Sequence, residues 1–514
     1  MKYFNRTGAG QFDRRQFLAS SAAALLATAT MPGISLAAAE TPKIGGTLKV
    51  GVPGGAADSL DPHLNQGQVS EIVRFTNLFD GLTGFGDGSD VQMVLAESFT
   101  SNDKADAWTV KLRKGVKTHD GKDFTADDVI YSVKRILDPT KPTKGAKLID
   151  AVNPDKLQKV DDHTVIFNLK RPYGPFPELW ANRFLRLVPR DFDPAKAIGT
   201  GPFKLVSHTS GQQATMARFD DYFGEKAKVD NLVVITLADR TAATNSLRGG
   251  QVDIIYSVPY ADARLIEADP RLHIVNNPAT QYIPVVMRTD MKPFDDVRVR
   301  QAMRLIVDRE QMVKVALNGY GDVANDMVGR YLPCGATNVV QRKQDIEKAK
   351  ALLAEAGQSG LTIDLATGGD LSGMPEAAQV FAEQAKAAGV TINVKVMEAS
   401  AFLANYGNWP LAMDFYNDLY MGLVSRTLLP GGPFNVTHFD DAEFNKLAEE
   451  AFQTSDVAKR CTLIEKMRTI EYERGGNIVW GWSNILNAHN DKVKGLVPHR
   501  VDSPLLHLNR VWLS

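Results

Sequence analysis

The stretch WTVKLRKGVKTHDGKDFTADDVIYSVKRILDP, residues 108–139, contains a strand, a turn and a helix in that order. Apolar and polar side chains alternate at its start, which is the pattern of a half-buried strand. The pair Asp120-Gly121 then predicts a turn, because glycine tolerates the positive φ that such turns often need. Thr125 and Asp128 have the spacing of a helix capping box. The helix that follows is amphipathic, and its apolar positions are Val129, Ile130, Val133 and Ile136.

The same stretch resembles the signature of the family 5 extracellular solute-binding proteins. That family includes the periplasmic dipeptide-, oligopeptide- and nickel-binding proteins of ABC importers. Thr118 is a departure, since family members usually carry an aromatic residue at this place. Three further segments resemble family motifs and occur in the family's order: GTGPFKL at 199–205, PFDDVRVRQA at 293–302 and DIEKAKALLAEAG at 345–357. The resemblance covers essentially all of the chain after residue 39.

This resemblance implies an α/β protein with the two-lobed periplasmic binding protein fold of the peptide-binding type, class II. In that fold the first lobe is discontinuous and carries an extra subdomain, and a ligand is enclosed between the lobes. The expected division is residues 40–85, 199–288 and 480–514 for lobe I, 86–198 for the extra subdomain, and 289–479 for lobe II.

The first 39 residues have the features of an export signal. Arg14-Arg15 begins a twin-arginine motif, an alanine- and leucine-rich run follows, and residues 37–39 supply small side chains for cleavage. Polar residues and a proline interrupt the run, so a membrane-spanning helix is not expected. No cysteine follows the signal to carry a lipid. The sequence therefore predicts a periplasmic protein without a lipid anchor, exported by the twin-arginine translocase.

Composition and charge are those of an ordinary soluble protein. The 514 residues are 44% hydrophobic and 23% charged. Removing residues 1–39 takes away four basic residues and one acidic residue, which changes the formal net charge from −1 to −4. Such a chain has no excess of basic residues for nucleic acid or an anionic membrane surface.

The two cysteines, Cys334 and Cys461, leave their state open. An oxidising compartment allows them to pair, but their separation in sequence does not give the distance between their Cα atoms. Buried unpaired thiols are slightly favoured, with a disulfide as the close alternative. The nine histidines are scattered without a cluster, so we expect no metal site and no cofactor.

Candidate ligand contacts in lobe I come from two loops. Gln66 and Gln68 follow an Asp-Pro pair on a loop that reaches the ligand in the family, and their amides can donate and accept hydrogen bonds. Exposure to solvent is the alternative. Arg183 and Arg186 lie where some family members direct arginine toward a ligand carboxylate. Because residues three apart in a strand point to opposite faces, at most one arginine is expected to reach the ligand, and a solvated or salt-bridged role is the alternative.

In lobe II the resemblance directs attention to residues 413–422. In peptide-binding family members an aspartate of this region pairs with the amino terminus of the ligand. This chain has aspartates at 414 and 418 but lacks the family's tryptophan, so the alignment is loose. A carboxylate beside an amide and two phenol rings suits a cationic or zwitterionic solute, although a buried core cluster is the alternative. The main candidates are Asp418, Tyr416, Asn417 and Tyr420. The weaker candidates are Trp409 and Arg330.

The sequence therefore predicts a monomeric receptor that binds a small peptide or peptide-like solute and delivers it to the permease subunits of an ABC importer. The same fold binding an opine, an oligosaccharide or a metal chelate is the main alternative. An exported hydrolase is a further alternative, but the chain lacks the local motifs of zinc proteases, serine hydrolases and nucleotide-binding enzymes. We expect no enzymatic activity.

Overall fold

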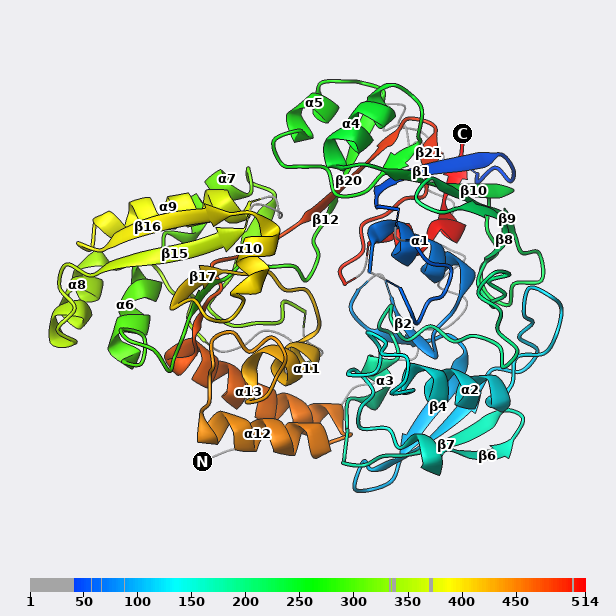
Figure 1. Cartoon of the computed structure of the whole chain (residues 1–514), viewed down its shortest axis with the longest axis horizontal. Coiled ribbons are helices and arrows are strands. Elements are labelled where there is room, and N and C mark those ends of the chain that lie inside the picture. Colours follow the sequence, from blue (N-terminus) through cyan, green and yellow to red (C-terminus); the bar gives the residue numbers. More distant parts are fainter. Residues whose placement is uncertain are drawn as a thin grey trace, which may run out of the picture. The chain divides into compact units, whose positions relative to one another are not determined.

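The computed structural model describes residues 41–514 except 57, 66, 87, 332–333, 335–338, 369–372 and 502. The predicted export signal lies outside these residues. The described strands form a seven-stranded, a five-stranded and a four-stranded sheet, together with three two-stranded ribbons. Figure 1 shows that helices pack beside each of the larger sheets. No helix among the described residues is long and apolar enough to cross a membrane.

The seven-stranded sheet is assembled from distant parts of the chain. Its strands, in spatial order, are β12 (Leu272–Asn277), β20 (Ile485–Asn490), β11 (Ile254–Ile255), β1 (Thr47–Pro53), β10 (Asn231–Leu237), β9 (Gln213–Arg218) and β8 (Phe203–Thr209). β1 runs parallel to β10 and β11, and the other neighbours are antiparallel. The helices beside it are α1 (Val69–Leu78), α4 (Arg240–Arg248) and α5 (Ala263–Glu267).

The four-stranded sheet contains the strand of the segment 108–139 and packs against its helix. Its order is β4 (Ala96–Ser101), β5 (Ala107–Leu112), β7 (Thr164–Asn168) and β6 (Gln158–Asp161). The predicted strand corresponds to β5, and the predicted helix is α2 (Ala126–Ile136), which begins with the Thr125–Asp128 capping box. Its apolar face packs on the sheet, and α3 (Phe176–Leu179) contributes Phe176 to the same core. The local prediction is therefore confirmed.

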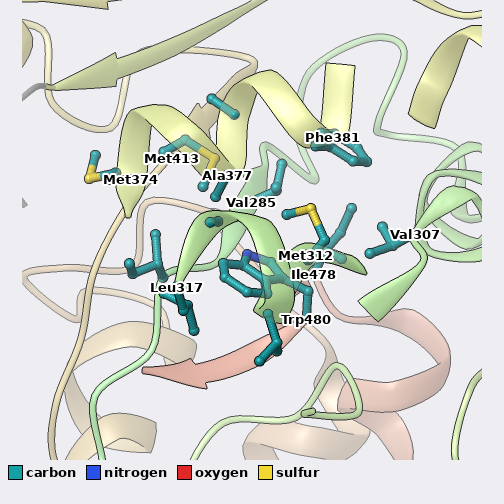
Figure 2. Packing of buried hydrophobic residues seen from close by; sticks show 14 of the residues in the cluster. Val285, Val307, Met312, Leu317, Met374, Ala377, Phe381, Met413, Ile478 and Trp480 are labelled. Atoms are coloured by element: carbon teal, nitrogen blue, oxygen red, sulfur yellow. The ribbon is translucent and has the colours of Figure 1, made fainter. Parts of the chain in front are cut away.

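The five-stranded sheet lies later in the chain and is surrounded by helices. Its order is β16 (Thr391–Met397), β15 (Thr362–Gly368), β17 (Leu411–Met413), β13 (Val285–Met287) and β18 (Asn477–Ile478). The associated helices are α6 (Val297–Ile306), α7 (Arg309–Ala316), α8 (Ile346–Glu355), α9 (Met374–Lys386), α10 (Ala399–Ala404), α11 (Tyr420–Leu423), α12 (Ala442–Gln453) and α13 (Val457–Arg474). Figure 2 shows Met374, Ala377 and Phe381 of α9 beside Met413, Val285 and Trp480 in the core.

The remaining short elements complete these units. They are the ribbons β2 (Thr83–Phe85) with β3 (Val91–Met93), β14 (Gly321–Val323) with β19 (Gly481–Ser483) and β21 (Val493–Lys494) with β22 (Trp512–Leu513), the 3-10 turns Pro154–Lys156, Pro504–Leu506 and Leu508–Arg510, and the π-helical turn Val424–Leu428. The chain passes between the two largest sheets twice, once after β12 and once before β20. The predicted lobe boundaries remain predictions.

Cys334 and Cys461 form a disulfide, with their Cα atoms 5.1 Å apart. The slight preference for unpaired thiols was therefore wrong. The two residues are 127 positions apart in the chain, and only the fold brings the loop at Cys334 against α13. No local sequence pattern reports such a distance.

Candidate functional site

Three parallel strands of the seven-stranded sheet end at one edge. β1, β10 and β11 end at Pro53, Leu237 and Ile255. In open α/β sheets, ligands bind outside the carboxyl ends of parallel strands, where the loops leave the sheet. The residues that follow these strands are therefore the first place to look for a ligand contact in this half of the molecule.

The loop after β1 is fixed by Gln68. Its side-chain oxygen accepts a hydrogen bond from the Gly55 amide at 2.5 Å, and Gln68 also forms a capping box with Glu71 at the start of α1. A Cβ atom on Gly54 would lie 2.6 Å from Ser70 Oγ, so the loop packs too closely for a larger residue. Gln68 thus positions this edge. Gln66, the other predicted glutamine, lies outside the described residues.

Tyr256 directly follows β11, and two arginine charges act on it. Burial raises the pKa of the Tyr256 phenol, and the positive charges of Arg183 and Arg240 oppose that rise. Arg240 Nε donates to Ser257 Oγ at 3.2 Å. Tyr256 and Arg240 were not predicted. Tyr256 directly follows β11, and Arg240 begins α4 after the short turn that follows β10.

Arg183 carries a charge that no acidic side chain neutralises among the residues the structure describes. Its guanidinium lies 5.5 Å from the centre of the Phe184 ring, and its Nε is buried without a hydrogen-bond partner. Arg186 is directed elsewhere: its charge acts on Asp80, whose pKa burial raises to about 6. The two arginines thus have different surroundings, and Arg183 is the one whose charge acts on Tyr256.

Parallel strands also end together in the five-stranded sheet. β15 pairs in parallel with β16 and with β17. β17 ends at Met413, so the predicted segment 414–418 begins at the carboxyl edge of this sheet. The residues directly after β15 lie outside the described part of the chain.

Tyr416 is occupied by an internal partner. Asp414 is only 3% exposed and accepts hydrogen bonds from Tyr416 Oη at 2.6 Å, from Tyr406 Oη at 2.7 Å and from the Phe415 amide at 2.8 Å. Burial raises the pKa of Asp414 to about 6, although these hydrogen bonds favour the ionised carboxylate. The Tyr416 phenol therefore holds a buried carboxylate of its own lobe.

Tyr420 is similarly enclosed. It is 2% exposed, and its hydroxyl donates to Glu471 Oε1 at 2.5 Å. Glu471 also accepts from the Val328 amide at 3.0 Å, and burial raises the pKa of this glutamate to about 7. Tyr416 and Tyr420, both candidates from the sequence, thus fit the alternative of a buried core cluster.

Asp418 and Asn417 remain near the surface. Asn417 is exposed, and the Asp418 side chain is 21% exposed. Asp418 forms an ion pair with Arg426, 2.7 Å between Oδ2 and Nη2, while its Oδ1 accepts from the Leu419 amide at 2.8 Å. Its charge also acts on a tyrosine in the core of the four-stranded sheet: burial, Glu178 and Asp418, in that order, raise the pKa of Tyr173. Arg426 was not predicted, because it lies eight residues further along the chain.

The two weaker candidates have different surroundings. Trp409 is half-buried against the core of the five-stranded sheet, and its Nε1 is buried without a hydrogen-bond partner among the described residues. Arg330 forms an ion pair with Asp322 and donates to the Ala279 carbonyl at 3.2 Å and to Asn484 Oδ1 at 3.3 Å. Arg330 therefore ties its loop to both segments that connect the largest sheets.

A further contact joins residues 173–178 to α12 and α13. The Gly174 amide donates to the Phe452 carbonyl at 2.5 Å, and the Tyr173 and Phe452 ring centres are 5.3 Å apart. Glu178 forms an ion pair with Arg460. A Cβ atom on Gly174 would lie 1.9 Å from the Thr454 carbonyl oxygen, so this approach requires glycine.

Comparisons with known proteins place these features in a family. The family model described as bacterial extracellular solute-binding proteins, family 5 Middle, matches residues 90–422. The glutathione-binding protein GsiB of Escherichia coli O1:K1 is 25% identical over 496 residues, covering 91% of this chain and 94% of GsiB.

Solved structures show the same fold. The periplasmic binding protein AgaA of A. tumefaciens R10, in complex with agropinic acid, has a TM-score of 0.74 and 25% identity, covering 91% of this chain and 99% of AgaA. The ABC transporter-associated periplasmic binding protein DppA of Helicobacter pylori, in complex with the peptide STSA, has a TM-score of 0.75 and 22% identity, covering 92% and 98%. The chain belongs to the family 5 extracellular solute-binding proteins of bacterial ABC importers and has their two-lobed α/β fold.

Proposed function

We propose that this protein captures a small peptide or peptide-like solute between its two lobes and delivers it to the permease subunits of an ABC importer. One observation carries the proposal beyond the family. Tyr256 and Arg240 follow parallel strands at the carboxyl edge of the seven-stranded sheet, the charge of Arg183 acts on Tyr256, and Asn417 and Asp418 follow β17 at the carboxyl edge of the five-stranded sheet. These residues offer a polar solute hydrogen-bonding groups and, in Arg183, a cation with no acidic partner among the described residues.

The chemistry of the relatives agrees with this class of ligand. GsiB is a glutathione-binding protein, and glutathione is a peptide with two carboxylates. AgaA was solved with agropinic acid, so an opine is the second candidate ligand class. The uncompensated Arg183 suits either ligand through a carboxylate. An oligosaccharide lacks a carboxylate, so it is a weaker candidate ligand than a peptide or an opine.

The export motif in the first 39 residues supports a proposal for the cellular setting. We propose that the twin-arginine translocase exports the protein to the periplasm, where it acts as a monomer and binds its solute without converting it. Replacing Arg14 and Arg15 together by lysine should retain the precursor in the cytoplasm, which cell fractionation and immunoblotting will show.

A ligand panel tests the function. The mature protein, residues 40–514, is titrated by calorimetry and thermal shift with glutathione, the tetrapeptide Ser-Thr-Ser-Ala, agropinic acid, maltotriose and nickel–histidine. A peptide present at 100 times its Kd should stabilise the protein by about 2.7 kcal/mol. Recovery of the unchanged compound by mass spectrometry distinguishes a receptor from a hydrolase. Stabilisation by maltotriose or nickel–histidine alone would contradict the peptide assignment.

Arg183 provides the residue-level test. Arg183→Gln should weaken binding of a carboxylate ligand by about tenfold or more, because charge-assisted hydrogen bonds contribute about 1.5–3 kcal/mol. Arg171→Gln is the matched control, since Arg171 is an exposed arginine of the same subdomain paired with Asp150. Equal affinity in both variants would remove Arg183 from the site.

A further inference from the structure

The loop after β17 presents a carboxylate that is already neutralised. Arg426 Nη2 lies 2.7 Å from Asp418 Oδ2, and the Leu419 amide occupies Oδ1. A free carboxylate at this edge would attract a cationic group of the solute. Here both oxygens of Asp418 have partners from the same lobe.

The arginine is held in place from several sides. Its Nε donates to the Gly422 carbonyl at 3.4 Å, and its guanidinium lies 6.0 Å from the centre of the Phe434 ring. A Cβ atom on Gly422 would come within 2.9 Å of Asp418 Cγ, so the carboxylate packs directly against the backbone of α11. The ion pair is therefore a built part of the lobe rather than a chance approach of two long side chains.

Two large aromatic side chains close to the pair in sequence or in space are exposed. Phe415, three residues before Asp418 in the chain, is 54% exposed, and Phe434, whose ring lies near the Arg426 guanidinium, is 42% exposed. Asn417, the exposed residue between Phe415 and Asp418 in sequence, adds an amide. These side chains offer a solute aromatic surface and a neutral hydrogen-bonding group beside an ion pair whose two charges balance.

We propose that this part of the site takes an uncharged group of the solute, and that Arg426 excludes a free ammonium group from Asp418. The proposal rests on the peptide-like ligand proposed above and refines its class. The preferred ligands are peptides or amino-acid conjugates whose amino group is acylated or otherwise blocked. Arg426 is then a specificity-determining residue, because it occupies the carboxylate that an amino terminus would need.

The experiment compares free and N-acetylated ligands. Calorimetry measures the Kd of Ser-Thr-Ser-Ala and of glutathione, each with a free and with an acetylated amino group. The proteins are the wild type, Arg426→Gln, Arg426→Lys and Arg474→Gln. Arg474 is the matched control, because it is another partly exposed lobe II arginine paired with an aspartate, Asp441. Circular dichroism and thermal melting verify that each variant is folded.

The wild type should bind the acetylated form at least as tightly as the free form. Arg426→Gln exposes the Asp418 charge and should shift the ratio of affinities toward the free amine by about tenfold, as expected for one charge-assisted hydrogen bond. Arg426→Lys and Arg474→Gln should keep the wild-type ratio. The ratio of the wild-type affinities for the acetylated and free ligands is measured without any variant. It therefore tests the proposal even if Arg426→Gln does not fold.

Three outcomes overturn the inference. Tighter binding of the free form by the wild type, by about tenfold or more, contradicts it while leaving the peptide-receptor function intact. An unchanged ratio in a folded Arg426→Gln removes Arg426 as the determinant. If no form of either peptide binds the wild type, the proposed function fails and the inference fails with it.

Discussion

Two carboxylates of this protein, Asp326 and Glu178, pair with largely buried arginines but connect different parts of the molecule. Arg309 and Arg342 each approach Asp326 Oδ2 at 2.7 Å inside lobe II, where the Asp326 side chain is fully buried. Glu178 and Arg460 join α3, which packs on the core of the four-stranded sheet, to α13, which belongs to another core. The first network stabilises one packed unit, whereas the second holds two units against each other. The structural role of such an ion pair thus depends on whether its two residues belong to one packed core or to two.

The largest effect is expected at Asp326. Asp326→Asn leaves Arg309 and Arg342 without an anionic partner in the interior, which should lower the free energy of unfolding by about 3–5 kcal/mol. Urea denaturation measures the loss. Asp364→Asn is the control, because Asp364 is exposed and its pairing with Lys395 is loose, at 3.9 Å. A loss at Asp326 no larger than that of the control would contradict the role of the network.

The disulfide sharpens the comparison because Cys461 is adjacent to Arg460. Replacing both cysteines by serine removes a covalent link between α13 and the loop at Cys334, which should lower the free energy of unfolding by about 2–4 kcal/mol. The Glu178–Arg460 pair should survive, since the helix itself stays packed through Ile464 and Met467. Denaturation of the oxidised and reduced wild type gives an independent measurement. Equal stability of the two forms would contradict the expectation.

Asp414 is a buried carboxylate held by tyrosine hydroxyls instead of arginine, and this should give stability a pH dependence. Its pKa of about 6 in the folded state lies above the unfolded value. The stabilisation is complete below the unfolded pKa of about 3.9 and is lost as pH rises through the folded pKa, by about 1–3 kcal/mol in total. Urea denaturation between about pH 4 and pH 8 measures the slope. Asp414→Asn should reduce the slope without abolishing it, because burial also raises the pKa of Asp80 and of Glu471. An unchanged slope would exclude Asp414 as a contributor.

The smallest effect on unfolding is expected at Glu178. Glu178→Gln should lower the free energy of unfolding by only about 1 kcal/mol, because the pair is partly exposed and neither core depends on it. Its effect should appear in the arrangement of the units. Spin labels at positions 171 and 466, on the extra subdomain and α13, should report a broader and longer distance distribution in the variant. Glu97→Gln is the control, and identical distributions in all three proteins would contradict this role.

Local patterns predicted β5 and α2 correctly. The alternation at 108–112 and the capping box at Thr125 specify β5 and α2 through neighbours within a few residues. Pairing between distant residues was not readable in the same way. Cys334 meets Cys461, and Tyr420 meets Glu471 51 residues later, only because α13 folds back beside these segments.

The candidate site shows the same limit. The family resemblance directed attention to residues 413–422, and the structure shows that residues 414–418 follow β17, but the division of their side chains depends on burial. Asp414 and Tyr416 point into the lobe, whereas Phe415 and Asn417 are exposed. The residue types in this segment do not show whether a tyrosine hydroxyl binds a carboxylate of the protein or a ligand. Which side chains contact the solute remains a prediction.

The position of β20 has a consequence for the order in which the protein is built. This strand, residues 485–490, lies between β12 and β11, which are made more than 200 residues earlier. Until it arrives, the facing edges of β11 and β12 have no partner, and unpaired edges invite association with other chains. The seven-stranded sheet therefore closes only after nearly the whole polypeptide has left the ribosome. A chain truncated before residue 485 would lack the strand that joins β12 to the rest of this sheet.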